Sequence, residues 1–242
     1  MKQMENVVSK LRMIGKEPKI LSDSAAMIKD THSGEVVAYK ADKTGKLEEL
    51  RFEEVITFSS TDKFIATLAA GDYSLFDNQL NIKLKLFSEK PVDIYNGLFF
   101  EVKSPKHNTV RILGLDGTPL SGYNATKIKK WKLNDNSIII ESYFLWDKAT
   151  LDILTFEPYS GYNTKSIGID LQDLDDNTID IGSNIVVAMN STGTKLYEFD
   201  FNGRLKLSIP NGRIQRNKAG TSILLNDRFG RKLKEIKRLA TL

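Results

Sequence analysis

The stretch "DLQDLDDNTID" at 170–180 is the densest group of side chains that could bind a metal ion, with five aspartates in eleven residues. Hard cations such as Ca²⁺ need several carboxylate oxygens. Counted from Asp173, the spacing of Asp175 and Asn177 matches the first ligand positions of an EF-hand loop. However, Thr178 stands where that loop needs glycine, and Asn184 where it needs a bidentate glutamate. The pattern therefore favours a polar turn, with a weak calcium site as the alternative.

Few residues suit covalent or acid–base catalysis. The chain has no cysteine, and its two histidines, His32 and His107, lie in the turn-like segments "DTHSGE" and "SPKHNT". The sequence contains neither a G-x-S-x-G nucleophile motif nor a G-x-x-x-x-G-K-[ST] phosphate loop. We therefore predict no catalytic residue, no metal site and no cofactor.

The segment "KIKKWKL" at 127–133 places four lysines around a tryptophan. In a strand, Lys130 and Lys132 would lie on one face because side chains alternate. Basic side chains beside an aromatic ring are typical of single-stranded nucleic-acid binding, where a base stacks on the ring. Lys130, Trp131 and Lys132 are accordingly the candidate residues of a nucleic-acid site. The alternative for Trp131 is packing between two sheets, which is the commoner use of tryptophan.

Charge divides the chain into an acidic body with basic ends. Residues 213–242 hold nine basic and two acidic residues, residues 1–20 five and two, and the whole chain has a net charge of +4. The ends therefore carry +10 together and residues 21–212 carry −6. Such an asymmetry predicts either a basic surface for a partner or helix surfaces kept soluble by lysine and arginine.

Two short helices are expected at these ends. Apolar residues recur at helical spacing over 4–14, with Gly15 after them, and over 231–242. Isolated helices of this length are marginal in water, so something must cover their apolar stripes. The expected partner-binding residues are Val7, Leu11, Arg228, Arg231, Lys232, Lys234 and Leu239.

The elements between the ends read as repeated hairpins. The run "YEFDFNGRLKLSI" at 197–209 joins two alternating stretches by a turn with Asp200 and Gly203, and similar turns recur along the chain. First strands fall near Ile20, Val55, Val92, Ile128, Ile169 and Ile214, at intervals of 35 to 45 residues. A four-stranded unit with this period predicts β-propeller blades, each of which buries its faces against its neighbours.

The stretches "FDFNGRLKLSI" and "LGLDGTPLSG" resemble the blades of β-propellers of the YVTN and NHL type, over most of residues 19–226. This resemblance implies an all-β fold: a small β-propeller of five to six four-stranded blades with short terminal helices. It implies no particular activity. The expected parts are an N-terminal helix or arm at 1–18, one ring at 19–226 closed by strands from the two ends, and a C-terminal basic helix or tail at 227–242.

The leading hypothesis is a non-enzymatic binding or assembly module that contacts protein partners, including further copies of itself or a larger assembly. In its lack of cysteine and its small blades, the chain is similar to the propeller-bearing tail proteins of short-tailed phages. The more specific form of the hypothesis is therefore a virion or tail subunit. The alternatives are a nucleic-acid-binding protein that uses its basic termini, and a propeller hydrolase or lyase. We expect a cytoplasmic or virion location, since no apolar run approaches the roughly 20 residues of a membrane span.

Overall fold

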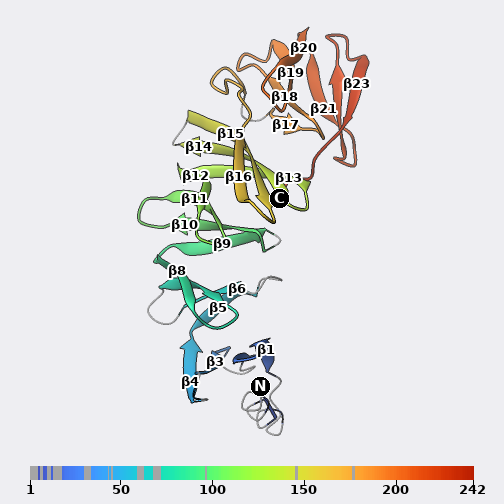
Figure 1. Cartoon of the computed structure of the whole chain (residues 1–242). Coiled ribbons are helices and arrows are strands. Elements are labelled where there is room, and N and C mark those ends of the chain that lie inside the picture. The colour runs from blue at the N-terminus through green and yellow to red at the C-terminus, as the bar shows by residue number, and fades with distance from the viewer. Residues whose placement is uncertain are drawn as a thin grey trace. The chain divides into compact units, whose positions relative to one another are not determined.

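The computed structural model describes residues 5, 8, 9, 12, 18–29, 34–42, 44, 46–58, 63–67, 72–95, 97–144, 147–175 and 178–242. The chain forms two compact units. The first comprises Met1–Asn108 and Ile112–Pro119, and the second comprises Thr109–Arg111 and Leu120–Leu242. Nearly all of the regular structure described is antiparallel β-sheet in consecutive strand order (Figure 1).

Three sheets of four strands come first along the chain, each a simple meander. The first contains β1 (Lys19–Ser22), β2 (Ala25–Lys29), β3 (Val36–Ala41) and β4 (Leu47–Phe52). The second contains β5 (Glu54–Phe58), β6 (Lys63–Thr67), β7 (Tyr73–Asp77) and β8 (Ile82–Phe87). The third contains β9 (Lys90–Tyr95), β10 (Phe99–Ser104), β11 (Thr109–Gly114) and β12 (Pro119–Ala125).

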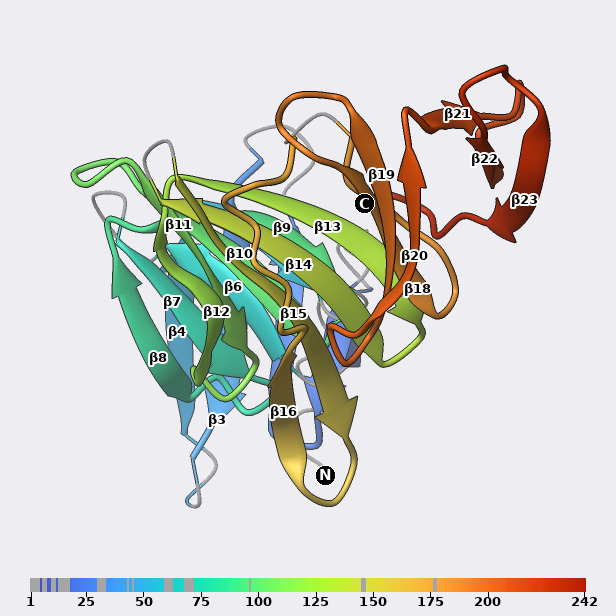
Figure 2. The same cartoon turned by 90° about the horizontal axis from the view of Figure 1, so that it is seen from above.

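Three more sheets follow in the second unit. The fourth contains β13 (Lys127–Asn134), β14 (Ser137–Phe144), β15 (Asp147–Glu157) and β16 (Gly161–Ser166). The fifth contains β17 (Asp180–Ile181), β18 (Ile185–Met189), β19 (Lys195–Asp200) and β20 (Leu205–Pro210). The sixth has three strands, β21 (Arg213–Arg216), β22 (Ser222–Asn226) and β23 (Lys232–Lys237), red in Figure 2.

Aspartate shapes the same hairpin in most of these sheets. The carboxylate of Asp200 accepts hydrogen bonds from the backbone amides of Asn202 (2.9 Å) and Arg204 (3.0 Å), between β19 and β20. Equivalent pairs of bonds to backbone amides are made between the third and fourth strands by Asp42 and Asp77, and between β22 and β23 by Asp227. In the third sheet, Asp116 accepts one such bond, from Thr118 N inside the turn. The aspartate therefore closes a hairpin, and its recurrence comes from the repeated sheet.

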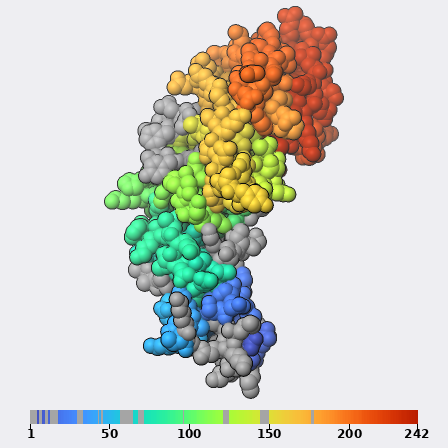
Figure 3. Space-filling view, in the orientation of Figure 1, coloured from blue at the N-terminus to red at the C-terminus, as the bar shows by residue number. Residues whose placement is uncertain are grey.

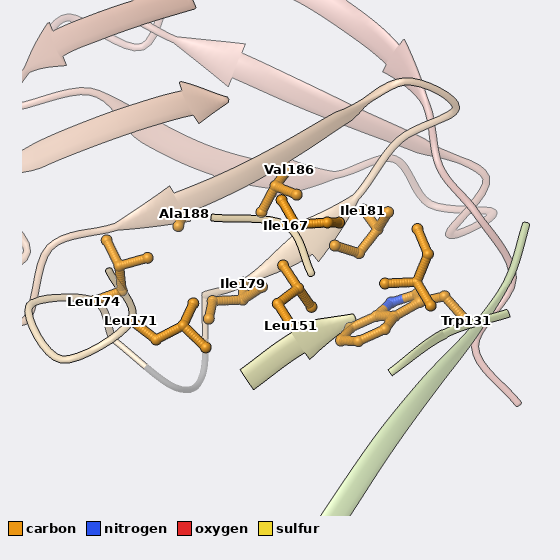
Figure 4. Close-up of a cluster of buried hydrophobic side chains, with 10 residues drawn as sticks. Trp131, Leu151, Ile167, Leu171, Leu174, Ile179, Ile181, Val186 and Ala188 are labelled. Carbon is orange, nitrogen blue, oxygen red and sulfur yellow. The ribbon is translucent and has the colours of Figure 1, made fainter. Parts of the chain in front are cut away.

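The cores lie between consecutive sheets. One buried cluster joins Phe52 of the first sheet to Phe76 of the second, and another joins Leu75 to Phe100 of the third. In the second unit, Trp131 and Ile139 of the fourth sheet pack with Val186 of the fifth (Figure 4). A further cluster joins the fifth and sixth sheets through Val187 and Ile223. The middle strands thus supply most of the buried apolar side chains, together with a few buried acids such as Glu141 and Glu198.

The predicted fold class, an all-β chain of propeller-type four-stranded sheets, is confirmed, with two corrections of detail. The fifth sheet starts at Asp180 and not near Ile169, because residues 167–175 form no strand. They include a turn closed by the bond from Leu174 N to Leu171 O (3.1 Å) and an isolated bridge between Leu174 and Asn190. The sixth sheet is one strand short. The single closed ring over 19–226 stays a prediction.

The C-terminal helix predicted over 231–242 is wrong. Residues Lys232–Lys237 form β23, which pairs with β22 from Ser222↔Lys237 to Asn226↔Lys232. The apolar residues Leu233 and Ile236 fit a helical spacing, but only Ile236 is buried, against the fifth sheet. Tertiary packing therefore selects the strand.

At the other end, Glu5, Val8, Ser9 and Arg12 are helical, and Val8 is buried beside Ala26. The predicted partner-binding residues Val7 and Leu11 lie outside the described residues. Within the part of the chain that the structure covers, there is no helix with the length and apolar character needed to cross a membrane.

Candidate functional site: a basic pocket in the second unit

The C-terminal segment 238–242 returns to the edges of two sheets after β23. Leu239 N donates to Ile181 O (2.8 Å) beside β17, and Gly182 and Arg238 form an isolated bridge. Further on, Lys132 N donates to Ala240 O (2.9 Å) and Leu242 N to Lys130 O (3.1 Å). The segment therefore extends the edge of β13 and brings the basic C-terminal region next to the lysine-rich strand (Figure 1).

A pocket of about 420 Å³ lies where these elements meet. Four of its lining side chains are basic and none is acidic. The lining residues are Ile128, Lys129, Lys130, Trp131, Ile179, Arg216, Arg238, Thr241 and Leu242. We call this site the basic pocket.

A buried carboxylate positions the two arginines. Asp180 is almost fully buried, and its Oδ1 and Oδ2 accept bonds from Arg238 Nε at 2.7 and 2.9 Å. Arg216 Nε donates to Asp180 Oδ2 at 2.7 Å. The Arg238 side chain is 12% exposed and that of Arg216 is 52% exposed. Since a buried charge must be paired, Asp180 anchors both guanidinium groups, and two positive charges share one negative charge.

Lys129 is held in a second group that also contains a buried carboxylate. Glu141 is fully buried on β14, directly opposite Lys129, whose Nζ lies 3.5 Å from Glu141 Oε2. The hydroxyl of Tyr143 donates to Glu141 Oε1. Burial, followed by this bond to a carboxylate, raises the pKa of Tyr143, which therefore stays neutral. Lys129 Nζ also lies 5.2 Å from the centre of the Tyr143 ring.

Trp131 belongs to the core and is 2% exposed. In Figure 4 its indole lies near Leu151 in the buried cluster. A buried ring cannot stack on a base, which corrects the nucleic-acid interpretation of this residue and supports packing between sheets. Lys130 lines the pocket, while Lys132 forms an ion pair with Asp135 at 2.8 Å. Of the three candidate nucleic-acid residues, Lys130 and Trp131 therefore line the pocket, Trp131 as a buried core residue.

The five predicted partner-binding residues that the structure describes are spread over three places. Arg228 and Arg231 flank the ring of Phe229 at the β22–β23 turn, with guanidinium carbons 4.5 and 5.4 Å from its centre. Phe229 is 67% exposed, and sequence reasoning missed it because it lies in a polar turn. Arg231 Nε also bonds to Asp227 Oδ2 at 2.7 Å.

On β23, Lys232 pairs with Glu235 at 3.0 Å and Lys234 with the buried Glu198 at 2.7 Å. Leu239 packs against the molecule's own core, beside the cluster that contains Trp131. The second unit therefore covers this leucine itself.

Two acids of the stretch 170–180, Asp170 and Asp180, have structural contacts. Asp170 Oδ1 accepts the amide of Gln172 at 3.0 Å, as in a turn, and Asp180 holds the arginines. Among the described residues, no three metal-ligating side chains come together. Sequence reasoning missed the role of Asp180, although a lone acid between Ile179 and Ile181 is a signal of a buried ion pair.

No family model and no curated protein matches this sequence. Many solved structures are similar in fold, and three of them illustrate the range. Kluyveromyces lactis Hsv2 is 8% identical, with 85% of this chain and 68% of that chain covered and a TM-score of 0.34. A eukaryotic initiation factor is 11% identical, with coverage of 93% and 66% and a TM-score of 0.41. The C-terminal WD40 domain of Sif2 is 10% identical, with coverage of 86% and 76% and a TM-score of 0.27. Such weak likenesses assign no activity, partner or binding residue to this chain.

Proposed function

We propose that this chain is a non-enzymatic binding module that takes an acidic segment of a protein partner at the basic pocket. The observation that supports this most is the set of four basic side chains around one pocket, two of them anchored by Asp180. Anchored guanidinium groups lose little further conformational entropy when they bind a carboxylate, which favours binding. Charge complementarity then selects an acidic partner over a basic one.

The more specific version is a subunit of a virion or a phage tail, in the cytoplasm before assembly and in the particle afterwards. The cysteine-free composition and the repeated small sheets support it. In that setting the acidic segment belongs to a neighbouring subunit or to a second copy of the chain. Co-sedimentation with assembled particles tests this version separately from peptide binding.

The proposal is tested with octaglutamate as the probe and with two variants that change charge equally. Lys130→Glu alters the pocket, whereas Lys218→Glu alters an exposed turn outside it. We expect Lys130→Glu to weaken octaglutamate binding about tenfold or more, equivalent to about 1.4 kcal/mol. Lys218→Glu should change it less than about twofold, as expected for a screened surface charge. Isothermal titration at two salt concentrations measures both.

Two outcomes would contradict the proposal. Equal weakening by the two variants would mean that only net charge matters. The second outcome is that a single-stranded oligonucleotide binds more tightly than octaglutamate, depends on Lys130 and loses affinity steeply as salt rises. It would mean that the chain is a nucleic-acid-binding protein.

A further inference from the structure

The fifth and sixth sheets are two copies of one sequence unit. Asn190, Gly193, Asp200 and Gly203 recur 27 residues later. Their counterparts are Asn217, Gly220, Asp227 and Gly230, and the segment 211–237 thus corresponds to 184–210. By this correspondence β21, β22 and β23 are equivalent to β18, β19 and β20.

The backbone confirms the equivalence. Gly193 and Gly220 both have φ of +69°, and Gly203 and Gly230 have +77° and +81°. Asn190 Oδ1 accepts the amide of Lys195 (2.7 Å), and Asn217 Oδ1 accepts that of Ser222 (3.1 Å), 27 residues later. The sixth sheet therefore lacks the strand equivalent to β17.

Among the described residues, β21 therefore has a strand partner on one side only, which is β22. In the fifth sheet, β17 pairs with β18 through Ile181↔Val186 and Asp180↔Val187. Shifted by 27 residues, these positions are Arg213 and Ile214. The sheet order ends at β21, and residues 178–242 are all described. The C-terminal segment does not fill the gap, because it pairs with β13 and bridges to Gly182 beside β17.

Side chains on β21 indicate what would pair there. Where β18 carries Val186 and Met189, β21 carries Arg213 and Arg216, and both arginines are exposed. Ile214 is partly buried against the cluster between the fifth and sixth sheets. The residues of this sheet contribute to the red surface in Figure 3. An unpaired edge offers a row of backbone donors and acceptors, and its arginines favour an acidic strand.

We propose that β21 accepts an extended acidic segment of a protein partner as the fourth strand of the sixth sheet. This inference deepens the proposed function and rests on it, since it states how the acidic partner is held. Backbone hydrogen bonds supply affinity in such strand addition, and the side chains that alternate along the added strand supply specificity. Asp180 of β17 shows that a carboxylate can be held by the arginines of this region, because it binds Arg216 of β21 and Arg238.

The probe is a capped hexapeptide of alternating valine and aspartate, titrated into the full chain and followed by amide NMR. Two further peptides carry N-methyl groups on every second backbone amide. In one peptide the methylated amides lie along one edge of the strand, and in the other they lie along the opposite edge. We expect one methylated peptide to bind as the parent does and the other to bind about tenfold more weakly or not at all, because two to three backbone bonds are lost. Shifts should centre on the amides of 213–216.

Charge variants complete the test. Arg213 lies on β21 and is not among the residues that line the basic pocket. Arg213→Glu should therefore weaken binding of the aspartate peptide and strengthen binding of a peptide with lysine in place of aspartate. Arg228→Glu, at the hairpin tip, should change neither affinity. Equal binding of both methylated peptides, or no binding of any, would overturn strand addition. If octaglutamate still binds in a Lys130-dependent manner, the proposed function survives that result. If neither probe binds, both proposals fail.

Discussion

At the scale of single residues, aspartate and glycine in this chain mostly shape hairpins. Asp200 accepts two backbone amides, and the bond from Arg204 N is the largest cause that lowers the pKa of Asp200. Gly203 lies in the left-handed region at φ +77°, a backbone conformation that residues other than glycine rarely adopt. The turn in "YEFDFNGRLKLSI" therefore has a structural task.

A matched pair of glycines tests this interpretation. A Cβ on Gly203 would lie 2.4 Å from the carbonyl oxygen of Gly168, whereas a Cβ on Gly230, at φ +81°, would meet nothing within 4 Å. We expect Gly230→Ala to cost about 1–2 kcal/mol from left-handed strain. Gly203→Ala should cost roughly 1–3 kcal/mol more, because backbone must move. Urea unfolding measures both free energies, and equal losses would contradict the assigned contact.

At the scale of elements, the C-terminal segment stabilises the second unit. It closes three backbone hydrogen bonds with β13 and the residues of β17, and it places Leu239 against the core. Without it, the edges of both strands lose these partners. The sequence predicts that Leu239 contacts a partner, whereas in the structure Leu239 packs against the core of the second unit.

Removal of residues 239–242 should therefore destabilise the isolated protein by about 2–4 kcal/mol, from three hydrogen bonds and a partly buried leucine. Leu239→Ala should lower the melting temperature measurably. Leu233→Ala should not, because Leu233 is 54% exposed. If the truncation left the melting temperature unchanged, the segment would not stabilise the core, and a role in binding a partner would be favoured instead.

At the scale of the whole molecule, the first three sheets share buried clusters with one another, and so do the last three. The repeat predicts that all six close into one ring over 19–226. A closed, compact chain of this length has a radius of gyration of about 18 Å. An open row of sheets spaced about 10 Å apart gives a larger value and a longer maximum dimension. Small-angle X-ray scattering distinguishes the two, and a clearly larger radius would refute closure.

The repeat was predictable from sequence because hairpin turns and alternating runs are local. First strands predicted at Ile20, Val55, Val92 and Ile128 lie within β1, β5, β9 and β13. The fifth sheet begins later than the pattern predicts, since "IDLQDLDDNTID" alternates like a hairpin but its described part bonds to a local turn and to residues 189–191. The terminal stretch 231–242 was misread because Leu233 and Ile236 suit a helix or a strand at that length.

The basic pocket depends on contacts that no local pattern contains. Charge counting alone located both the lysines of 127–133 and the basic C-terminal region, but as separate features. Their meeting needs the chain to turn back after Lys237 and pair with β13, and it needs Asp180 to be buried beside Arg216 and Arg238, 36 and 58 residues away. Turn chemistry and periodicity act over a few residues, so the sequence by itself determined the sheets. Burial and long-range pairing, which only the tertiary structure decides, formed the site.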